Sequence, residues 1–244
     1  MFHVKHPRKP SAQPPDQIAN TAIELVEEAL VAIGFVPENH DFLTRIERFA
    51  AALALWGDRT NLTAAPDDST ELAFHIIDSL APLIVAGRPE GAILRGRFGN
   101  GQRVLDLGSG AGFPGLILAA ATDAHFTLLE ARRKRASFLT IVAAEMGLAN
   151  VEVDARRRDP EQLRPAFVVV TGRAFAHPAI FHPAAGAALE PGGLAILYAN
   201  PEQELESRAA AESGLVEVGP IAYAIPRAKR KVERILAVWR KPDD

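Results

Sequence analysis

The stretch RVLDLGSGAGFPG, residues 103–115, joins an apolar strand-like run to a glycine-rich loop, with an acid inside the apolar run. The acid is Asp106, and the loop glycines are Gly108, Gly110, Gly112 and Gly115. The spacing fits G-x-G-x-x-G over 110–115, typical of dinucleotide binding, and also G-x-G-x-G over 108–112. Both patterns let a ligand approach the backbone closely. The glycines alone therefore leave the choice of ligand open.

Asp106 favours a cationic ligand without phosphate. A carboxylate would repel a pyrophosphate, whereas S-adenosyl-L-methionine carries an ammonium group and a sulfonium. The desolvation of a buried acid is offset when it accepts hydrogen bonds from loop amides and from an ammonium group. Glu130 stands about 20 residues after the glycines, at the end of the next expected strand, where such folds bind ribose hydroxyls. The alternatives are that Asp106 only braces the loop and that Glu130 is an exposed acid.

A parallel sheet must position these residues. Strand-like and helical runs alternate from residue 103 onward, which predicts an α/β fold. The expected strands are 103–107, 125–129, 151–153, 167–171 and 194–198, the last of them after a Pro-Gly-Gly turn. Two final runs, GLVEVGPIAYAI and KVERILAVWRK, predict an antiparallel hairpin that forms one edge of the sheet.

Helical patterns precede the sheet. We expect Asp16 to cap a first helix that Gly34 ends, and Asp68 to cap a later helix that extends through Leu83. The proline-rich, polar N-terminus offers little to bury. We therefore divide the chain into a disordered tail at 1–15, a helical N-terminal extension at 16–100 and the α/β domain at 101–244.

The composition excludes several classes of protein. Of 244 residues, 48% are hydrophobic and 23% charged, which indicates a globular protein with a sizeable core. No apolar run is long enough to span a membrane and no secretory signal is present, so we expect a cytoplasmic protein. The absence of cysteine removes thiolate chemistry and fits a reducing compartment, and the scattered histidines lack the spacing of a metal site. Nothing in the sequence demands a dimer, so we expect a monomer.

The net charge of −3 argues against a strongly basic nucleic-acid binder, but the basic residues cluster. The clusters are Arg132, Arg133, Lys134 and Arg135; Arg156, Arg157 and Arg158; and Arg227, Lys229, Arg230 and Lys231. Each is either a solvated surface or a set of contacts to nucleic-acid phosphates.

Several motifs together resemble one family. They are NLTA (61–64), HIIDSL (75–80), DLGSGAGFPGL (106–116), LLEARRKRASFL (128–139) and GRAF (172–175), followed by a closing hairpin. From about Phe49 to its C-terminus, the chain resembles the bacterial small-subunit ribosomal RNA guanine-N7 methyltransferases, also called glucose-inhibited division protein B. The resemblance implies a Rossmann-like class I methyltransferase sheet that transfers a methyl group from S-adenosyl-L-methionine to N7 of a guanine in 16S ribosomal RNA. The implied partner is ribosomal RNA within a small subunit or an assembly intermediate.

The resemblance also implies which residues contact the methyl donor. Besides Asp106, Glu130, Gly110 and Gly112, these are Gly108, Phe113, Arg158, Asp159 and Arg173. Two features depart from the family pattern: Tyr198-Ala199-Asn200 replaces a usual lysine-glycine pair, and the fourth strand lacks an acid near its start. These departures concern the substrate side of the site more than the donor side.

Guanine N7 carries a lone pair and no proton, so its methylation needs no general base, and we expect none. His75, Asp78 and Ser79 share one face of a helix. Three interpretations of His75 and Asp78 are open. Helix capping or surface polarity is favoured most, followed by orienting the helical extension or contacting RNA. Catalysis by His75 with Asp78 is favoured least. Because N7 is hidden in the narrow major groove of paired RNA, the target base should be unpaired or extruded. Phe113 and Phe175 are candidates to border that base, and the alternative for each is a place in the hydrophobic core.

Three rival functions remain open on the sequence. The chain could methylate a small molecule or a protein. It could be a nicotinamide-dependent oxidoreductase that uses the 110–115 glycines. It could also be a catalytically weak RNA-binding assembly factor with the same fold, an interpretation that the 198–200 departure supports.

Overall fold

The computed structural model describes residues 14–60, 62, 65, 67–173, 178–228 and 230–243, and for residues 57–60 only the backbone. The predicted candidates Phe175 and Lys229, and most of the NLTA motif, lie outside the described residues.

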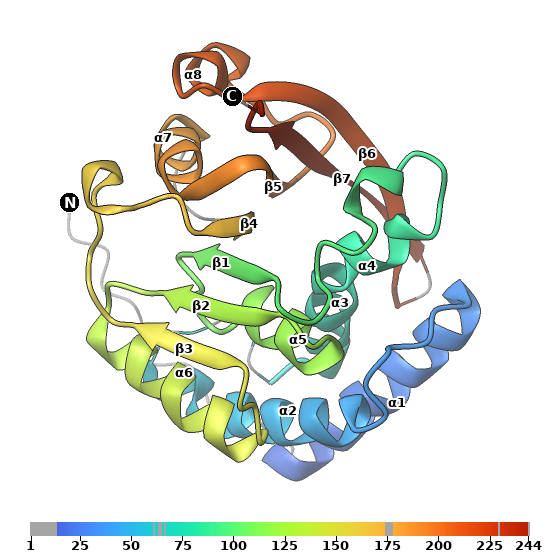
Figure 1. The fold of residues 1–244 in the computed structure, drawn as a ribbon. Helices are drawn as coiled ribbons and strands as arrows, with labels where there is room; N and C mark the ends of the chain where they lie inside the picture. Colours follow the sequence, from blue (N-terminus) through green and yellow to red (C-terminus); the bar gives the residue numbers. More distant parts are fainter. Residues whose placement is uncertain are drawn as a thin grey trace, which may run out of the picture.

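Within the described residues, one seven-stranded sheet has the strand order β3-β2-β1-β4-β5-β7-β6 (Figure 1). Its strands are β1 (Arg103–Leu107), β2 (His125–Leu129), β3 (Val151–Asp154), β4 (Phe167–Arg173), β5 (Leu189–Ala199), β6 (Val216–Arg227) and β7 (Arg230–Arg240). Strands β1 to β5 are parallel, and β7 pairs antiparallel with both β5 and β6. The predicted parallel sheet with an antiparallel hairpin at its edge is confirmed.

Helices connect and cover the strands. Those described are α1 (Pro15–Ile33), α2 (Phe42–Thr60), α3 (Ser69–Ser79), α4 (Ala81–Ala86), α5 (Gly115–Ala121), α6 (Arg133–Glu145), α7 (Pro178–Ala188) and α8 (Ser207–Glu212), with short 3-10 turns η1 (Ala92–Leu94) and η2 (Pro160–Gln162). Among them, none combines the length and the apolar character needed to cross a membrane.

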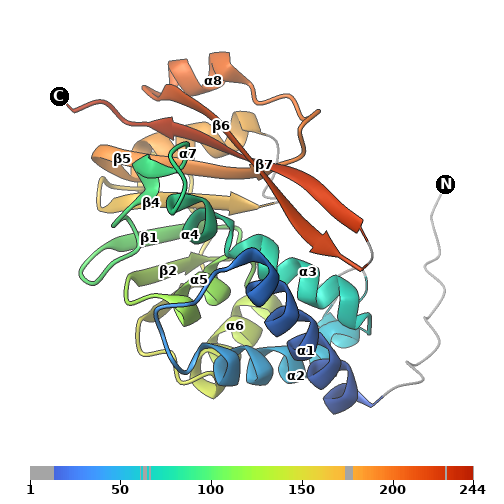
Figure 2. The same cartoon turned by 90° about the vertical axis from the view of Figure 1, so that its right-hand side faces the viewer.

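Alternate strand residues pack into two hydrophobic clusters, one on each face of the sheet. Val104 and Val169 belong to the larger cluster, whereas their neighbours Leu105 and Val170 belong to the smaller one. Residues of α1 to α6 complete the larger cluster, and residues of α7 and α8 complete the smaller one. The helices therefore form two layers around the sheet, with α1, α2 and α3 grouped together on one side (Figure 2).

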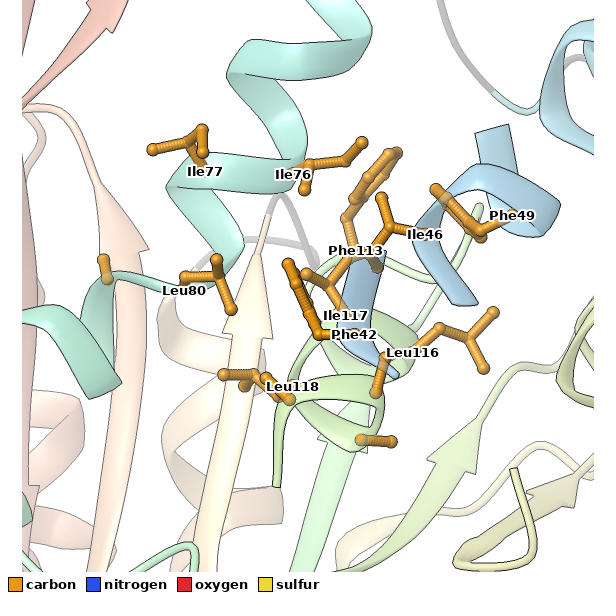
Figure 3. Close-up of a cluster of buried hydrophobic side chains, with 14 of the residues drawn as sticks. Phe42, Ile46, Phe49, Ile76, Ile77, Leu80, Phe113, Leu116, Ile117 and Leu118 are labelled. Carbon is orange, nitrogen blue, oxygen red and sulfur yellow. The ribbon is translucent and has the colours of Figure 1, made fainter. Parts of the chain in front are cut away.

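The larger cluster joins the N-terminal helices to the sheet domain (Figure 3). Phe49 from α2 and Ile76 from α3 are fully buried and lie beside Phe113 and Leu116 of the glycine loop and α5. Arg45 and Arg48 of α2 also donate to carbonyl groups at the ends of α5 and α6, at 3.5 and 3.3 Å. The division at residue 100 stays a prediction, and the hydrophobic core runs across it.

Two details of the N-terminal helices differ from the prediction. Asp16 does not cap α1: the N-cap is Pro14, and Asp16 lies in the first turn, where its charge favours the helix dipole. The predicted helix through Leu83 is instead α3 followed by α4, because Pro82 has no N–H to bond the carbonyl of Asp78.

Two predicted helix ends are confirmed. Asp68 caps α3 by accepting from the backbone N–H groups of Thr70 and Glu71 at 2.9 and 3.1 Å. Gly34 ends α1 in the left-handed conformation, with φ of 72°.

The Pro-Gly-Gly segment lies inside β5, which begins at Leu189, and it interrupts the pairing of β5 with β4. The register passes from Phe167 paired with Leu189 to Val169 paired with Leu194, so the segment forms an irregularity within the strand, and regular pairing resumes at Leu194, where the predicted strand begins. Gly192 adopts a φ of +73° inside β5, and its N–H donates to Lys241 at 2.9 Å. The segment following β7 therefore holds this end of β5 in the sheet.

Candidate active site

The glycine loop follows β1 and leads directly into α5. Gly108, Gly110 and Gly112 all have positive φ, at 69°, 58° and 101°, a region that side chains rarely enter. The Gly108 N–H donates to the carbonyl of Leu129 at 2.8 Å, which fastens the loop to the end of β2. A Cβ at Gly110 would make ordinary van der Waals contacts, at 3.7 Å from the Gly108 carbonyl oxygen and 3.9 Å from the Arg135 guanidinium. The loop thus has the shape expected of a close-approach site.

Asp106 is buried beneath the N-terminus of α5, with 1% of its surface exposed. Its Oδ2 accepts from the Gly115 N–H at 3.2 Å, and its Oδ1 accepts from the Thr171 hydroxyl at 2.9 Å. The predicted hydrogen bond from a loop amide is confirmed. Burial nevertheless raises the pKa of Asp106 to about 6, against the lowering effect of its hydrogen bonds. A cation beside this carboxylate would offset that desolvation.

Glu130 closes the same site from the end of β2. It is 6% exposed, its Oε2 accepts from the Gly110 N–H at 3.0 Å, and its Oε1 accepts from the Arg132 N–H at 2.8 Å. The alternative of an exposed acid is therefore wrong, because two backbone amides fold around the carboxylate. Each oxygen keeps acceptor capacity for a hydroxyl.

Phe113 lies where the glycine loop meets the N-terminal helices. Its ring centroid is 5.2 Å from that of Phe49 on α2 and 5.4 Å from that of His75 on α3. Only 9% of Phe113 is exposed, so it forms part of the core wall of the site (Figure 3).

Arg173 reaches from the end of β4 to α3. Its Nη1 donates to the carbonyl of His75 at 3.1 Å and to the Ser79 hydroxyl at 3.2 Å, and its Nη2 contacts Nδ1 of His75. Its guanidinium carbon lies 5.4 Å from the centre of the Phe113 ring. Arg173 therefore connects α3 to the glycine loop.

His75 is unsuited to act as a base. Burial, and then the charges of Arg173, Arg227 and Arg234, lower its pKa to about 3. The contact to Arg173 makes Nδ1 an acceptor, which leaves the ring proton on Nε2. The ring of His75 is turned toward Arg173 and Phe113. Its contact with RNA stays a prediction.

Arg158 and Asp159 contact residues outside the glycine loop. Arg158 pairs with Asp154 at 2.9 Å, and hydrogen bonding from Arg156, together with that pair, lowers the pKa of Asp154. The N–H of Asp159 donates to Gln162 at 3.1 Å at the start of η2. Any contact of this pair with a donor stays a prediction and would use backbone atoms.

The first basic cluster stands at the beginning of α6, directly after Glu130. Arg132, Arg133 and Lys134 are exposed, whereas Arg135 is half-buried near Gly110. Cations at a helix N-terminus are unfavourable beside the helix dipole, and an anion bound there would offset both charges.

The hairpin cluster divides in two. Arg227 pairs with Glu71 of α3 at 2.7 Å and lies over the ring of Phe74, while Arg230 and Lys231 are exposed. Arg227 therefore anchors the hairpin to α3, which leaves the exposed residues for outside contacts.

The sequence reasoning missed the partners supplied by β4, β5 and the hairpin. Thr171, which holds Asp106, is its register neighbour on β4. Tyr198 and Asn200, taken as departures, have structural partners: Tyr198 donates to the carbonyl of Ser79 at 2.8 Å, and Asn200 accepts from Arg234. Strand register could have revealed Thr171, but nothing local in the sequence signals the contacts between β5, β7 and α3.

Two buried carboxylates beside an open glycine backbone fit a cationic, hydroxyl-bearing ligand such as S-adenosyl-L-methionine. The pKa of Asp106 stays raised despite its hydrogen bonds and the charge of Arg173, Glu130 accepts from two amides, and Gly110 carries no side chain. In the part of the chain that the structure describes, no three potential metal-ligating side chains come together.

Comparison with known proteins identifies the family. The family model for rRNA small subunit methyltransferase G matches residues 43–234, a segment that includes the glycine loop, both carboxylates and α3. The chain belongs to the rRNA small subunit methyltransferase G family.

Curated members of the rRNA small subunit methyltransferase G family support this assignment. One from Halorhodospira halophila is 38% identical over 177 residues, covering 72% of this chain and 77% of the relative. One from Wolinella succinogenes is 41% identical over 124 residues, covering 50% of this chain and 57% of the relative. The chain thus spans little more than half of the Wolinella protein's length.

The fold of this family member also matches a solved structure. A crystal structure from Galdieria sulphuraria, described as a candidate sarcosine dimethylglycine methyltransferase, superposes with a TM-score of 0.52 at 14% identity. The match covers 72% of this chain and 89% of that one. It confirms the predicted Rossmann-like methyltransferase fold.

Proposed function

We propose that this protein transfers a methyl group from S-adenosyl-L-methionine to N7 of a guanine in small-subunit ribosomal RNA. The observation that carries the proposal is the family match over 43–234, which includes a glycine loop flanked by two buried carboxylates.

The site residues suit the donor in complementary ways. S-adenosyl-L-methionine supplies an electrophilic methyl group on a sulfonium when it is bound. Asp106 offers negative charge in a dry position beside Gly115, at the end of the glycine loop, and Glu130 offers acceptors for ribose hydroxyls. The glycine backbone admits the ligand without a side chain in the way.

The chain's contribution to the reaction is placement and the exclusion of water. Guanine N7 needs no proton removed, and His75 is neutral and held by Arg173, so no residue has to act as a base. Phe113 and Phe49 form an apolar wall beside the loop. A dry, oriented site of this kind accelerates transfer by holding the reacting atoms in line.

The exposed cations at the start of α6 favour an anionic substrate. Arg132, Arg133 and Lys134 and the positive end of the helix all attract phosphate, and they follow Glu130 directly in the chain. With an overall charge of −3, we expect weak binding to naked RNA and tighter binding to a small subunit or assembly intermediate. We further propose that the protein acts as a cytoplasmic monomer.

Methyl transfer from tritiated S-adenosyl-L-methionine tests the function. Purified protein is incubated with small subunits from cells that lack it, and labelled nucleosides are identified by mass spectrometry. The expected product is N7-methylguanosine in the small-subunit RNA, with little label in naked RNA. A small molecule or protein as the labelled product would reassign the substrate.

Calorimetric titration separates the remaining rivals. Binding of NAD without any response to S-adenosyl-L-methionine would identify an oxidoreductase. Binding of the methyl donor and of subunits without transfer would identify an assembly factor.

A further inference from the structure

Asp78 is a fully buried carboxylate on α3 that the proposed reaction does not use. Its Oδ1 accepts from the Tyr223 hydroxyl at 2.7 Å and lies 3.4 Å from Nε of Arg234. Its Oδ2 lies 3.4 Å from Nε of Arg173 and makes no hydrogen bond to any residue that the structure describes. One carboxylate thus serves two guanidinium groups, one from β4 and one from β7.

Arg173 is the member of this group that reaches the candidate site. Its side chain is 11% exposed, and its guanidinium is held by the His75 carbonyl, His75 Nδ1 and the Ser79 hydroxyl, all on α3. The same guanidinium lies over Phe113, in the middle of the glycine loop. A shift of Arg173 would therefore remove a contact of Phe113 and alter the surroundings of the glycine loop.

We propose that Asp78 is a positioning residue, which fixes Arg173 against Phe113 and so sets the shape of the donor pocket. The proposal rests on the donor site described under the proposed function. Without the carboxylate, Arg173 and Arg234 would be two like charges in a largely buried space. Arginine is long and flexible, so the guanidinium of Arg173 would then turn toward solvent.

A purely structural role predicts something different. If Asp78 only tied α3 to the hairpin, its loss would lower stability and leave the affinity of the folded protein for its donor unchanged. Asn150 provides the matched control. Its side chain donates to three carbonyl groups, of Ala119, Thr122 and Ala124. It precedes β3, at the amino ends of the parallel strands, whereas the glycine loop follows the carboxyl end of β1.

The experiment compares Asp78→Asn with Asn150→Ala in the full chain, at a temperature where both are folded by circular dichroism. Calorimetry with S-adenosyl-L-methionine is expected to show affinity about tenfold weaker for Asp78→Asn, because a displaced pocket wall misplaces the ligand. Asn150→Ala is expected to bind as the wild type does. Wild-type affinity in folded Asp78→Asn would overturn the proposal.

The ring of His75 reports on Arg173 independently of the donor. Loss of the Asp78 charge alone would lower the pKa of His75, whereas departure of Arg173 would raise it. Titration by NMR is therefore expected to show a higher pKa in Asp78→Asn and an unchanged one in Asn150→Ala. An unchanged or lower pKa in Asp78→Asn would show that Arg173 stays in place without the carboxylate.

These readouts distinguish the two proposals. If the wild type itself does not bind S-adenosyl-L-methionine, the proposed function fails. The His75 titration then still tests whether Asp78 keeps Arg173 in place. If Asp78→Asn does not fold, the double variant Asp78→Asn, Arg234→Met removes the repelling cation as well. In the folded double variant Arg173 lacks the attraction of the Asp78 carboxylate but is no longer repelled by Arg234, so we expect it to bind the donor more weakly than Arg234→Met alone, by a factor smaller than about tenfold. Equal affinity of the double variant and Arg234→Met would contradict the positioning role.

Discussion

Asp106 combines burial, good hydrogen bonds and a raised pKa. Hydrogen bonding from Ser109, Thr171 and Gly115 and the charge of Arg173 only partly offset the cost of burying the carboxylate, so the pKa of Asp106 is about 6 in the folded protein, above the usual 3.8. A group with a raised folded pKa stabilises the fold at low pH, and that contribution is lost as pH rises through about 6. At neutral pH the ionised Asp106 therefore costs stability, which a cationic ligand would return.

Asp106→Asn should separate stability from binding. The amide can accept from Gly115 and donate to Thr171, so the fold keeps both contacts while the buried charge is removed. At pH 8 we expect equal or higher thermal stability than the wild type, with affinity for S-adenosyl-L-methionine at least about tenfold weaker. Thermal unfolding at pH 5 and 8, with calorimetry, measures both. Unchanged donor affinity would mean that Asp106 only braces the loop.

His182 carries a different cost. It is fully buried on α7, 4.4 Å from the Trp239 ring, and neither ring nitrogen has a hydrogen-bond partner among the described residues. Burial lowers its pKa from 6.5 to about 4. The unfolded chain therefore takes up a proton first, and stability falls as pH drops from 6.5 toward 4. His75, with a pKa of about 3, acts in the same direction.

Replacing His182 with leucine should stabilise the protein. We expect a gain of about 1 kcal/mol at pH 7, since an unsatisfied buried polar group is removed. The decline in stability between pH 6.5 and 4 should also become shallower. Urea unfolding at pH 7 and 5 tests both expectations. An unaltered pH dependence of stability in the variant would mean that groups other than His182 cause the loss of stability at low pH.

At the scale of elements, the junction of β1, the glycine loop and α5 is packed to contact. A Cβ at Gly115, the first residue of α5, would lie 2.4 Å from the Leu128 side chain and 2.6 Å from Oδ2 of Asp106. Helix α5 therefore approaches β1 closely because position 115 has no side chain, and its first N–H can reach Asp106.

Gly115→Ala should damage this junction. We expect a loss of about 1–3 kcal/mol in unfolding free energy, from overpacking, together with weaker donor binding as Asp106 is pushed aside. Gly87→Ala is the matched control, because Gly87 is exposed and its nearest contact would be 3.7 Å away. Its effect should stay within about 0.5 kcal/mol. Equal effects of the two substitutions on donor affinity would contradict the close-packing account.

At the scale of the whole molecule, the exposed cations favour one surface for RNA binding, at the start of α6. Those at the start of α6 follow the carboxyl edge of the sheet, where the glycine loop also lies. Other exposed cations are spread over the fold: Arg88 follows α4, and Arg208 on α8 pairs with Glu212 at 2.9 Å. Among the residues that the structure describes, only the α6 group adjoins both a helix N-terminus and the candidate site.

The double variant Arg133→Gln, Lys134→Gln should weaken binding to small subunits and make it less dependent on salt. Loss of two phosphate contacts lowers the slope of log affinity against log salt by about 1.5. The double variant Arg88→Gln, Arg208→Gln removes the same charge elsewhere and should leave the slope near the wild-type value. Equal slopes for the two variants would mean that net charge, and not this surface, governs binding.

The sequence by itself determined the α/β architecture, the antiparallel edge, and the grouping of an acid with the glycines of the loop. Those features follow from local information: hydrophobic periodicity sets strands and helices, and a run such as DLGSGAGFPG places an acid and glycines within one turn of chain. Asp106, Gly110 and Gly115 were predictable because they are neighbours in the sequence.

Tertiary structure alone decided what surrounds that site. Asp78 meets Arg173, Tyr223 and Arg234 across separations of roughly 95 to 156 residues, and Thr171 reaches Asp106 only through the register of β1 and β4. Contacts of this kind depend on how strands order in the sheet and on which helix covers them, and no local pattern encodes either. For the same reason Tyr198 and Asn200 read as departures in the sequence, while in the folded chain they tie β5 to α3 and β7.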